Sequence, residues 1–395
     1  MDSLLAERNY LIHMLASLVN AAPPANPPEN LNWARLYEIA AYHHLSNMLC
    51  YGIEKLEPQW RPEQATMEKF QRDRKFALAK EAAQHFTLEQ VLRTLEKHRI
   101  FCLPLKGYLI KYLYPRPDMR LMADLDILFK DEQTEEVKEL MLGMGFTLKH
   151  FGANHDVYVK EPFINIEMHR RLVAQDSPYS GYLKKTWARA RLEEGSQYIH
   201  RLSWEDFYIY LLIHLAKHFS KGGTGIRSIL DIWLYEKHYG PLMDRNYIQR
   251  ELEEIKLQEF ARHMVELGQV WFGQAESNEL YDEIADYILA SGMYGTGKHG
   301  IITAINKNQG HGPRSVGLMK LRYRLKIFFP GLKHMSILYP FLHRLPFLLP
   351  VSWVLRGLKC LVGKRQRTFI IIRNIQSVSM KDLKRIQALH EKTGL

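Results

Sequence analysis

The stretch Met122-Ala123-Asp124-Leu125-Asp126-Ile127-Leu128-Phe129 alternates charged and apolar residues and then ends in an apolar run. Successive side chains of a β-strand point to opposite faces, so the pattern predicts a strand with Asp124 and Asp126 on one face and Leu125 and Ile127 on the other. Two carboxylates held this close repel each other unless a cation lies between them, and hard oxygen ligands suit Mg²⁺. The same pair also occurs at water-exposed strand edges, so the pair alone does not decide between a surface edge and a metal site.

A third carboxylate, Glu167, lies in the apolar stretch Phe163-Ile164-Asn165-Ile166-Glu167-Met168-His169, where an unpaired glutamate would be costly to bury. If this stretch is a strand beside 124–129, three carboxylates converge on one point. Such a cluster can hold two divalent ions about 4 Å apart, which clamp the attacking and leaving oxygens of a phosphoryl transfer. The sequence therefore predicts a site for two Mg²⁺ ions at Asp124, Asp126 and Glu167. His169 shares the face of Glu167, where it either orients an acceptor or makes a simple hydrogen bond.

Basic residues that could meet phosphate oxygens lie close to the acidic strand. Phe101 to Leu105 reads as a short strand, Lys106-Gly107 as a turn, and residues 108–114 as a helical stretch. Backbone amides at this turn, together with the Lys106 ammonium, are suited to phosphate oxygens, and Arg120 precedes the acidic strand closely enough to reach the same charge. We therefore expect Lys106, Gly107 and Arg120 to bind the phosphates of a substrate.

The surrounding sequence predicts an α+β fold, in which a small mixed β-sheet lies between helical N-terminal and C-terminal regions. Helical spacing and proline breaks predict helices over 3–20, 32–56 and 62–99, and the pattern changes at Ile100. Further strands are expected over 156–160 and 164–169, a helix from Asp131 to about Gly143 or Gly145, and a hairpin over 188–193 and 197–202. Ser203 is expected to cap the next helix. The predicted regions are 1–99 (helical), 100–202 (α/β core), 203–290 (helical, completing the cleft) and 291–395 (a basic tail with aromatic residues and prolines).

These motifs together resemble a known family. Leu105-Lys106-Gly107, Tyr114-Pro115, Arg120, the run from Asp124 to Leu128 and Glu167-x-His169 are similar to the poorly characterised nucleotidyltransferase branch of the polymerase-β superfamily, over roughly residues 30 to 240. The resemblance implies that Asp124 and Asp126 bind the catalytic metals and that Glu167 helps to activate an acceptor hydroxyl. Gly-Ser usually ends the first strand of that superfamily, whereas this chain has Lys106-Gly107, so Lys106 is the expected substitute for the serine.

Four residues further along have two interpretations each. His214 and His218 fall on one helical stripe, which suits either a metal-binding pair or two histidines hydrogen-bonded in the core. Arg227 and Asp231 are spaced for an ordinary i,i+4 ion pair. The resemblance extends through these residues and implies contacts with the nucleotide or the acceptor.

Charge is distributed unevenly along the chain. No acidic residue lies between Asp286 and Asp382, where sixteen Lys and Arg occur, although the whole chain has a net charge of only +11. Such a tail favours an anionic partner. Aromatic residues and prolines beside the basic residues in 313–373 favour shallow insertion at an anionic membrane surface; RNA binding, or packing of the apolar residues on the body of the protein, is the alternative.

Compartment and activity follow as expectations. Three cysteines do not suggest a disulfide framework, and the N-terminus lacks the features of a signal peptide, so we expect a cytoplasmic protein. The basic tail favours peripheral attachment to the inner face of the membrane. The expected activity is Mg²⁺-dependent transfer of a nucleoside monophosphate from a nucleoside triphosphate to an unidentified hydroxyl. The alternatives are a toxin-like enzyme that nucleotidylates RNA and a catalytically silent scaffold docked on a membrane.

Overall fold

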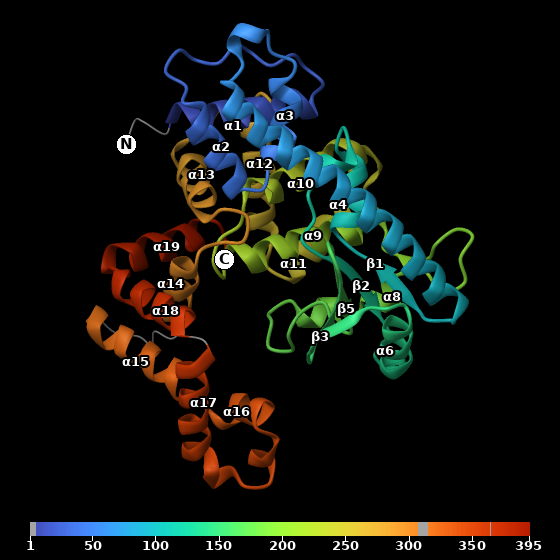
Figure 1. Ribbon diagram of the computed structural model, residues 1–395, viewed down its shortest axis with the longest axis vertical. Helices are drawn as coiled ribbons and strands as arrows, with labels where there is room; N and C mark the ends of the chain where they lie inside the picture. The colour runs from blue at the N-terminus through green and yellow to red at the C-terminus, as the bar shows by residue number, and fades with distance from the viewer. Residues whose placement is uncertain (1–4, 307–314, 364) are drawn as a thin grey trace. The chain divides into compact units, whose positions relative to one another are not determined.

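The computed structural model describes residues 5–306, 315–363 and 365–395, and within them not the side chains of residues 337 and 360–369. Residues 307–314 of the basic tail, which include the first two residues of the predicted membrane segment 313–373, lie outside the described residues. The chain divides into two compact units (Figure 1). The first comprises the described residues up to Ala216, Gly225–Ala285 and Gly394. The second unit comprises the described residues within Lys217–Thr224 and Asp286–Thr393, together with Leu395.

The first unit contains a mixed five-stranded sheet among helices. Its helices are α1 (Leu5–Val19), α2 (Trp33–Tyr42), α3 (Ser46–Ile53), α4 (Gln64–Lys97), α5 (Gly107–Ile110), α6 (Thr134–Gly143), α7 (Ser180–Leu183), α8 (Thr186–Arg189), α9 (Trp204–Phe219), α10 (Ile226–Tyr239), α11 (Arg245–Glu254), α12 (Gln258–Phe272) and α13 (Glu279–Ser291). Its strands are β1 (Cys102–Pro104), β2 (Leu125–Phe129), β3 (Thr147–Phe151), β4 (His155–Lys160), β5 (Ile164–His169), β6 (Arg191–Leu192) and β7 (His200–Arg201). The last residues of α9 and α13 belong to the second unit. The predicted α+β class is confirmed.

The order of strands in the sheet is β1-β2-β5-β4-β3. β2 and β5 are parallel neighbours, and all the other pairings are antiparallel. The register places Asp126 opposite Glu167 and Leu128 opposite His169. The strands that carry the predicted carboxylates are therefore adjacent, as the sequence analysis required for a metal site.

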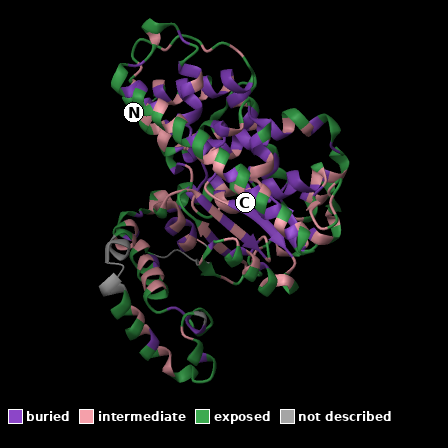
Figure 2. Cartoon of the chain, turned by 45° about the vertical axis from the view of Figure 1, so that its right-hand side comes forward, coloured by how far each residue is buried: buried purple, intermediate pink, exposed green. Residues whose placement is uncertain are grey.

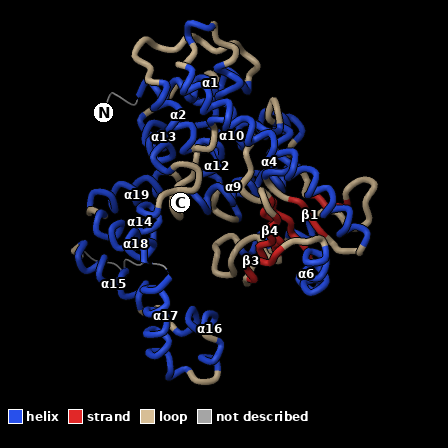
Figure 3. The backbone as a smooth tube through the Cα atoms, viewed as in Figure 1, coloured by secondary structure: helices blue, strands red, loops and turns tan. Residues whose placement is uncertain are grey.

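One face of the sheet packs on α4 and α6 (Figure 3). Helix α4 is 34 residues long and contains neither Gly nor Pro. Its buried stripe of Leu88, Val91, Leu92 and Leu95 recurs at helical spacing and contacts the apolar residues of β2 and β5. The alternate residues of β2 and β5, including Asp126 and Glu167, point to the opposite face.

Helices from both ends of the first unit pack together. α1 contacts α12, and the Asn20 amide donates to the Phe272 carbonyl oxygen at 2.7 Å. In place of the single helix expected over 32–56 the chain forms α2 and α3, because His44 adopts a left-handed conformation with φ of 56°. The cap expected at Ser203 is confirmed, since Ser203 accepts from the Asp206 amide. Asn32 caps α2 in the same way by accepting from the Arg35 amide.

The edge strand β3 is not recognisable in the sequence. Four of its five residues are exposed, so it lacks the apolar alternation that would predict a strand. The expected hairpin is much shorter than predicted, with two residues in each of β6 and β7. The helical stretch expected over 108–114 is a single α-helical turn, α5, followed by a 3₁₀ turn.

The second unit is helical over its described residues. It contains α14 (Gly297–Asn306), α15 (Val316–Phe328), α16 (Leu332–Leu338), α17 (Leu349–Gly363), α18 (Arg365–Ser377) and α19 (Met380–Lys392). α19 begins with a capping box, in which Ser379 and Asp382 satisfy each other's backbone amides. Among the described residues, no helix combines the length and the apolar character needed to span a bilayer.

Candidate active site

The three predicted carboxylates converge on the sheet face opposite α4. Asp124 comes one residue before β2, Asp126 lies in β2, and Glu167 lies opposite Asp126 in β5. Because strand side chains alternate, these residues share a face while Leu125 and Ile127 enter the core. The first strand brings a cation to the same place, since the Leu105 amide donates to the Asp126 carbonyl oxygen at 3.0 Å and thereby positions Lys106.

The Lys106 ammonium and the His169 ring hold one oxygen of Asp126. The Lys106 ammonium donates to Asp126 Oδ1 at 3.2 Å, and His169 Nε2 lies 2.8 Å from the same atom. Burial opposes ionisation of Asp126, but Lys106 and His169 outweigh it and hold the carboxyl pKa well below its ordinary value. The same contacts work in reverse on His169, where burial is outweighed by Asp126 and Glu167 and the pKa is raised. Asp126 Oδ2 makes no hydrogen bond with any described residue.

Asp124 differs from Asp126 in having neither a hydrogen bond nor an ion pair with the described residues. Burial and the adjacent Asp126 carboxylate raise the pKa of Asp124 to about 6. Glu167 contacts His155 and His169 through Oε2, at 3.6 and 3.4 Å, and its Oε1 is unused by the described residues. Oxygens of all three carboxylates are therefore available to a cation, and a hard divalent ion would relieve the repulsion that raises the pKa of Asp124.

The turn after β1 brings backbone close to the acidic strand. Lys106 has φ of 42°, and a Cβ added at Gly107 would overlap the side chains of Arg120 and Met122. Only glycine fits at this position without displacing Arg120. The helix that follows, α5, has four residues. Burial opposes the charged form of Lys106, but Asp126 and the surrounding anions outweigh this effect and raise its pKa.

Arg120 makes a buried bidentate pair that the sequence analysis did not anticipate. Its Nε and Nη2 donate to the two carboxylate oxygens of Asp231 at 2.8 and 2.7 Å, and the Tyr114 hydroxyl donates to Asp231 at 2.7 Å. Asp231 thus pairs with Arg120, which lies in the loop before β2, and not with Arg227, which is four residues before Asp231 in the same helix. Arg227 donates to the Leu121 carbonyl oxygen. The guanidinium expected to hold phosphate therefore ties α10 to the loop before β2.

Residues 29–273 of the chain match the protein family described as "Uncharacterised nucleotidyltransferase". The chain belongs to this nucleotidyltransferase family. The resemblance suggested by the Lys106-Gly107 turn and the Asp-x-Asp strand is confirmed, and the protein is a nucleotidyltransferase enzyme. Among solved structures, the solution structure of the antibiotic-resistance factor ANT(2″)-Ia is 12% identical with a TM-score of 0.34, and the match covers 46% of this chain and 98% of that one. No curated protein matches the chain.

Three residues beside the predicted carboxylates were not recognised as site candidates in the sequence. His155 lies opposite His169 in the β4–β5 register, and with Glu167 and His169 it forms a group whose ligand atoms lie within 4.8 Å of one another. Tyr210 of α9 and Lys80 of α4 interact electrostatically with Asp124. His155 immediately precedes the strand expected at Asp156, so a strand one residue longer would have included it; Lys80 and Tyr210 lie in long helical stretches that give no such signal.

The two histidines of α9, His214 and His218, are not part of the carboxylate cluster. His214 is partly buried one turn beyond Tyr210, and their rings are 6.4 Å apart. Neither His214 nor His218 belongs to the group of three potential metal ligands found among the described residues, which is His155, Glu167 and His169. Their proposed contacts with nucleotide or acceptor remain a prediction.

Proposed function

We propose that this nucleotidyltransferase moves a nucleoside monophosphate from a nucleoside triphosphate to an acceptor hydroxyl, and that the reaction depends on Mg²⁺. The observation that carries the proposal is the convergence of Asp124, Asp126 and Glu167, with Asp124 lacking any hydrogen-bond or ion-pair partner among the described residues. Asp124 is partly buried, and a carboxylate withdrawn from water is rarely left in this state unless a ligand completes it.

In this proposal Asp124 and Asp126 hold the metal, and Glu167 completes a second position. Bound Mg²⁺ would neutralise the developing charge on the transferred phosphoryl group and align the reacting oxygens. The acceptor oxygen bonds to the α-phosphorus as the bond from that phosphorus to the bridging oxygen breaks. Pyrophosphate leaves with that oxygen, and Glu167 accepts the acceptor proton before it passes to solvent.

Lys80 and Arg227 are the best candidates to hold the outer phosphates. Both side chains interact electrostatically with the Asp124 carboxylate. Burial and the neighbouring Arg227 lower the pKa of Lys80. Two cations that repel each other beside an anion site are stabilised when an anionic ligand arrives. Lys106 is already paired with Asp126, and Arg120 with Asp231. We therefore assign Lys106 to orienting Asp126 as well as to phosphate binding.

The first prediction concerns Lys80. Replacing Lys80 by Met should raise the KM for the triphosphate roughly tenfold, because a charge-assisted phosphate contact is lost. Initial rates at varied triphosphate concentration measure this effect. The matched control is Lys75→Met, which removes an exposed charge from the same helix and should leave KM unchanged. Equal KM values in wild type and in Lys80→Met would remove Lys80 from the site.

A direct test of the function uses purified protein, Mg²⁺ and each triphosphate in turn, labelled at the α-phosphate, with a cell extract as the source of acceptors. The label should appear in a product only when Mg²⁺ is present. Label in RNA would favour the toxin-like alternative, and no labelled product with any triphosphate would favour the silent scaffold. Asp124 argues against the scaffold, since an inactive protein gains nothing from a partly buried carboxylate that has no hydrogen bond or ion pair with the described residues.

A second candidate function, peripheral docking on an anionic membrane, has its support in the second unit. Figure 2 shows many exposed residues along its helices. The exposed residues include two apolar stripes. Leu318, Leu321, Leu325 and Phe328 follow one another at helical spacing along α15, and all are exposed. Val351, Val354, Leu355 and Leu358 do the same along α17. An apolar stripe on a helix normally faces a core or a partner.

The charges beside these stripes favour an anionic lipid surface as the partner. Lys320, Arg322, Arg324 and Lys326 lie between the apolar residues of α15, and no acidic residue occurs anywhere between Asp286 and Asp382. Each basic residue close to an anionic leaflet contributes about 1 kcal/mol to binding. Apolar insertion adds a contribution that salt does not screen.

The second prediction tests this docking with the full-length protein. Phe347, in the 3₁₀ turn just before α17, is also exposed. The triple variant Phe347→Ser, Val354→Ser, Leu358→Ser keeps the charge but removes apolar surface, and it should lose most binding to vesicles that contain anionic lipid. Sedimentation with vesicles at low and moderate salt measures it. Leu242→Ser is the matched control, because Leu242 is 65% exposed and Phe347 is 73% exposed. Binding equal to wild type in the triple variant would refute membrane insertion. Trp353 is a weak reporter, since it donates to the Pro330 carbonyl oxygen and contacts Phe329 edge-on.

A further inference from the structure

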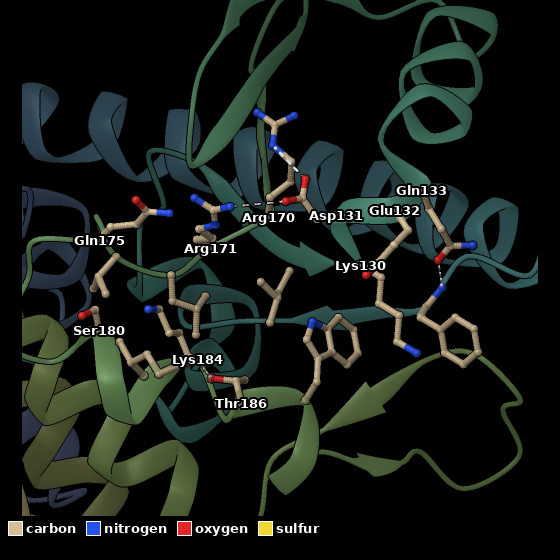
Figure 4. A pocket seen from close by; sticks show the side chains of 16 residues that line it. Lys130, Asp131, Glu132, Gln133, Arg170, Arg171, Gln175, Ser180, Lys184 and Thr186 are labelled. Carbon is tan, nitrogen blue, oxygen red and sulfur yellow. Dashed lines mark hydrogen bonds and ion pairs between the residues drawn. The ribbon is translucent and has the colours of Figure 1, made fainter. Parts of the chain in front are cut away.

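A cavity of about 710 Å³ opens at the carboxyl ends of β2 and β5 in the first unit (Figure 4). Lys130 and Arg170, the residues that follow these strands, contribute to its wall, and the segment around α7 and α8 supplies Leu183, Lys184 and Trp187. The volume falls within the range of about 300 to 1,000 Å³ typical of small-molecule sites. The proposed reaction assigns no role to this cavity.

The cavity adjoins the carboxylates on the same face of the sheet. Leu128, which lines it, comes two residues after Asp126 and lies opposite His169. Two residues along a strand correspond to about 7 Å, so the cavity begins within one small molecule's length of Asp126. Lys80 and Arg227 act on Asp124, at the other end of the acidic sequence. The carboxylates therefore lie between a pair of cations and the cavity.

This order matches the geometry of phosphoryl transfer. The attacking and leaving oxygens lie roughly in line on opposite sides of the transferred phosphorus. If the departing pyrophosphate is held beside Asp124, the attacking hydroxyl must approach from the Leu128 side. Glu167 and His169 lie next to that approach, because they are paired in register with Asp126 and Leu128.

The walls of the cavity combine aromatic rings with cations. The Lys130 ammonium lies 3.8 Å from the centre of the Phe101 ring and 5.8 Å from that of Trp187. Trp187 is only partly buried, so its indole can stack on a ligand ring. Such a wall favours a ring compound with an apolar face.

The charges of the cavity are only partly neutralised by its own acids. Arg170 is held by Asp156 in two hydrogen bonds of 2.8 and 2.9 Å, and Arg171 lies 3.6 Å from Asp131. Lys130 and Lys184 have no carboxylate within ion-pair distance among the described residues. Two ammonium groups, on opposite sides of the cavity (Figure 4), are thus left to meet anionic groups on a ligand, and Glu132 also lines the cavity.

We propose that this cavity binds the acceptor, and that the acceptor is a hydroxylated ring compound that carries a phosphate or a carboxylate. The inference rests on the proposed nucleotidyl transfer, to which it adds the class of acceptor. Trp187 would stack on the ring, while Lys184, across the cavity from Lys130 (Figure 4), would contact the anionic group. A neutral or cationic sugar would leave the Lys184 ammonium without a partner.

The test measures binding of four related sugars to the full-length protein by saturation-transfer NMR: glucose 1-phosphate, glucuronate, glucose and glucosamine. We expect the two anionic sugars to bind and the neutral and cationic sugars to bind at least tenfold more weakly. Lys184→Gln and Trp187→Ala should each weaken binding of the anionic sugars roughly tenfold, since each removes one main contact. Lys185→Gln is the matched control: Lys185 is the neighbouring exposed lysine and does not line the cavity.

If both anionic sugars bind, the cavity recognises negative charge. If only glucose 1-phosphate binds, the cavity recognises phosphate. Either result supports the inference. The inference is overturned if glucose or glucosamine binds as well as the anionic sugars, if Lys184→Gln behaves as Lys185→Gln does, or if no anionic sugar binds at millimolar concentration. Binding through Lys184 and Trp187 without any transfer from labelled triphosphate would instead refute the proposed function and leave the cavity as an anionic-sugar site.

Discussion

Asp124→Asn is expected to lower nucleotidyl transfer by at least about a thousandfold, because a neutral amide cannot replace a carboxylate ligand of the catalytic metal. The structure makes this the cleaner of the two aspartate substitutions. Asp124 has no hydrogen bond or ion pair with the described residues, whereas Asp126 holds Lys106 and His169. Asp126→Asn should lose activity equally, but it also takes the carboxylate partner from Lys106 and His169.

The same substitution should stabilise the metal-free protein at neutral pH. In the folded state the pKa of Asp124 is about 6, above its ordinary value of 3.8. Folding then favours the protonated acid, so ionisation costs stability as the pH rises from about 4 to about 6, by at most about 3 kcal/mol. In EDTA, the stability gained by Asp124→Asn should therefore be small at pH 4 and reach its maximum above pH 6. Urea unfolding at several pH values measures the difference.

Asp176→Asn provides a matched control, since Asp176 is an exposed carboxylate that lies outside the predicted site. It should change neither transfer nor stability. An Asp124→Asn enzyme that keeps more than a few per cent of wild-type transfer would show that the metal assignment is incorrect. Loss of activity with a parallel loss of stability would point to a structural role for Asp124 instead.

The central site could be predicted from sequence because its geometry is local to two strands. The alternation of Asp124, Leu125 and Asp126 determines which side chains share a face, and an apolar strand around Glu167 makes a lone carboxylate conspicuous. The predicted cluster of three carboxylates required β2 and β5 to be neighbouring strands. They are neighbours, and their register places Asp126 opposite Glu167.

Other parts of the site depend on contacts between residues far apart in the chain, which local patterns do not specify. Arg120 and Asp231 are 111 residues apart. Arg227 has the ideal helical spacing for Asp231, yet the partner of Asp231 is Arg120, because a bidentate guanidinium in the loop before β2 reaches it. The cavity is likewise built from β2, β5 and the α7–α8 segment, and no one of these stretches indicates a pocket in its sequence.

The largest effect on stability is expected at this buried pair. Arg120→Ala leaves the Asp231 carboxylate buried with only the Tyr114 hydroxyl to stabilise it, so the free energy of unfolding should fall by about 3 to 5 kcal/mol. Urea unfolding of the metal-free protein measures the loss. The double variant Arg120→Met, Asp231→Leu removes both charges and should recover much of it, because no unpaired charge then remains in the core.

Arg116→Ala is the comparison that separates burial from charge. Arg116 lies 3.3 Å from Asp118, but 55% of its side chain is exposed, so its removal should cost at most about 1 kcal/mol. The outcome at Arg120 also decides between its two proposed roles. A stable Arg120→Ala protein with a strongly raised KM for the triphosphate would mean that Arg120 binds phosphate, as its position before the acidic strand first suggested. A destabilised protein whose remaining folded fraction binds triphosphate normally would assign Arg120 to holding α10 against the loop before β2, and would leave Lys80 and Arg227 as the phosphate ligands.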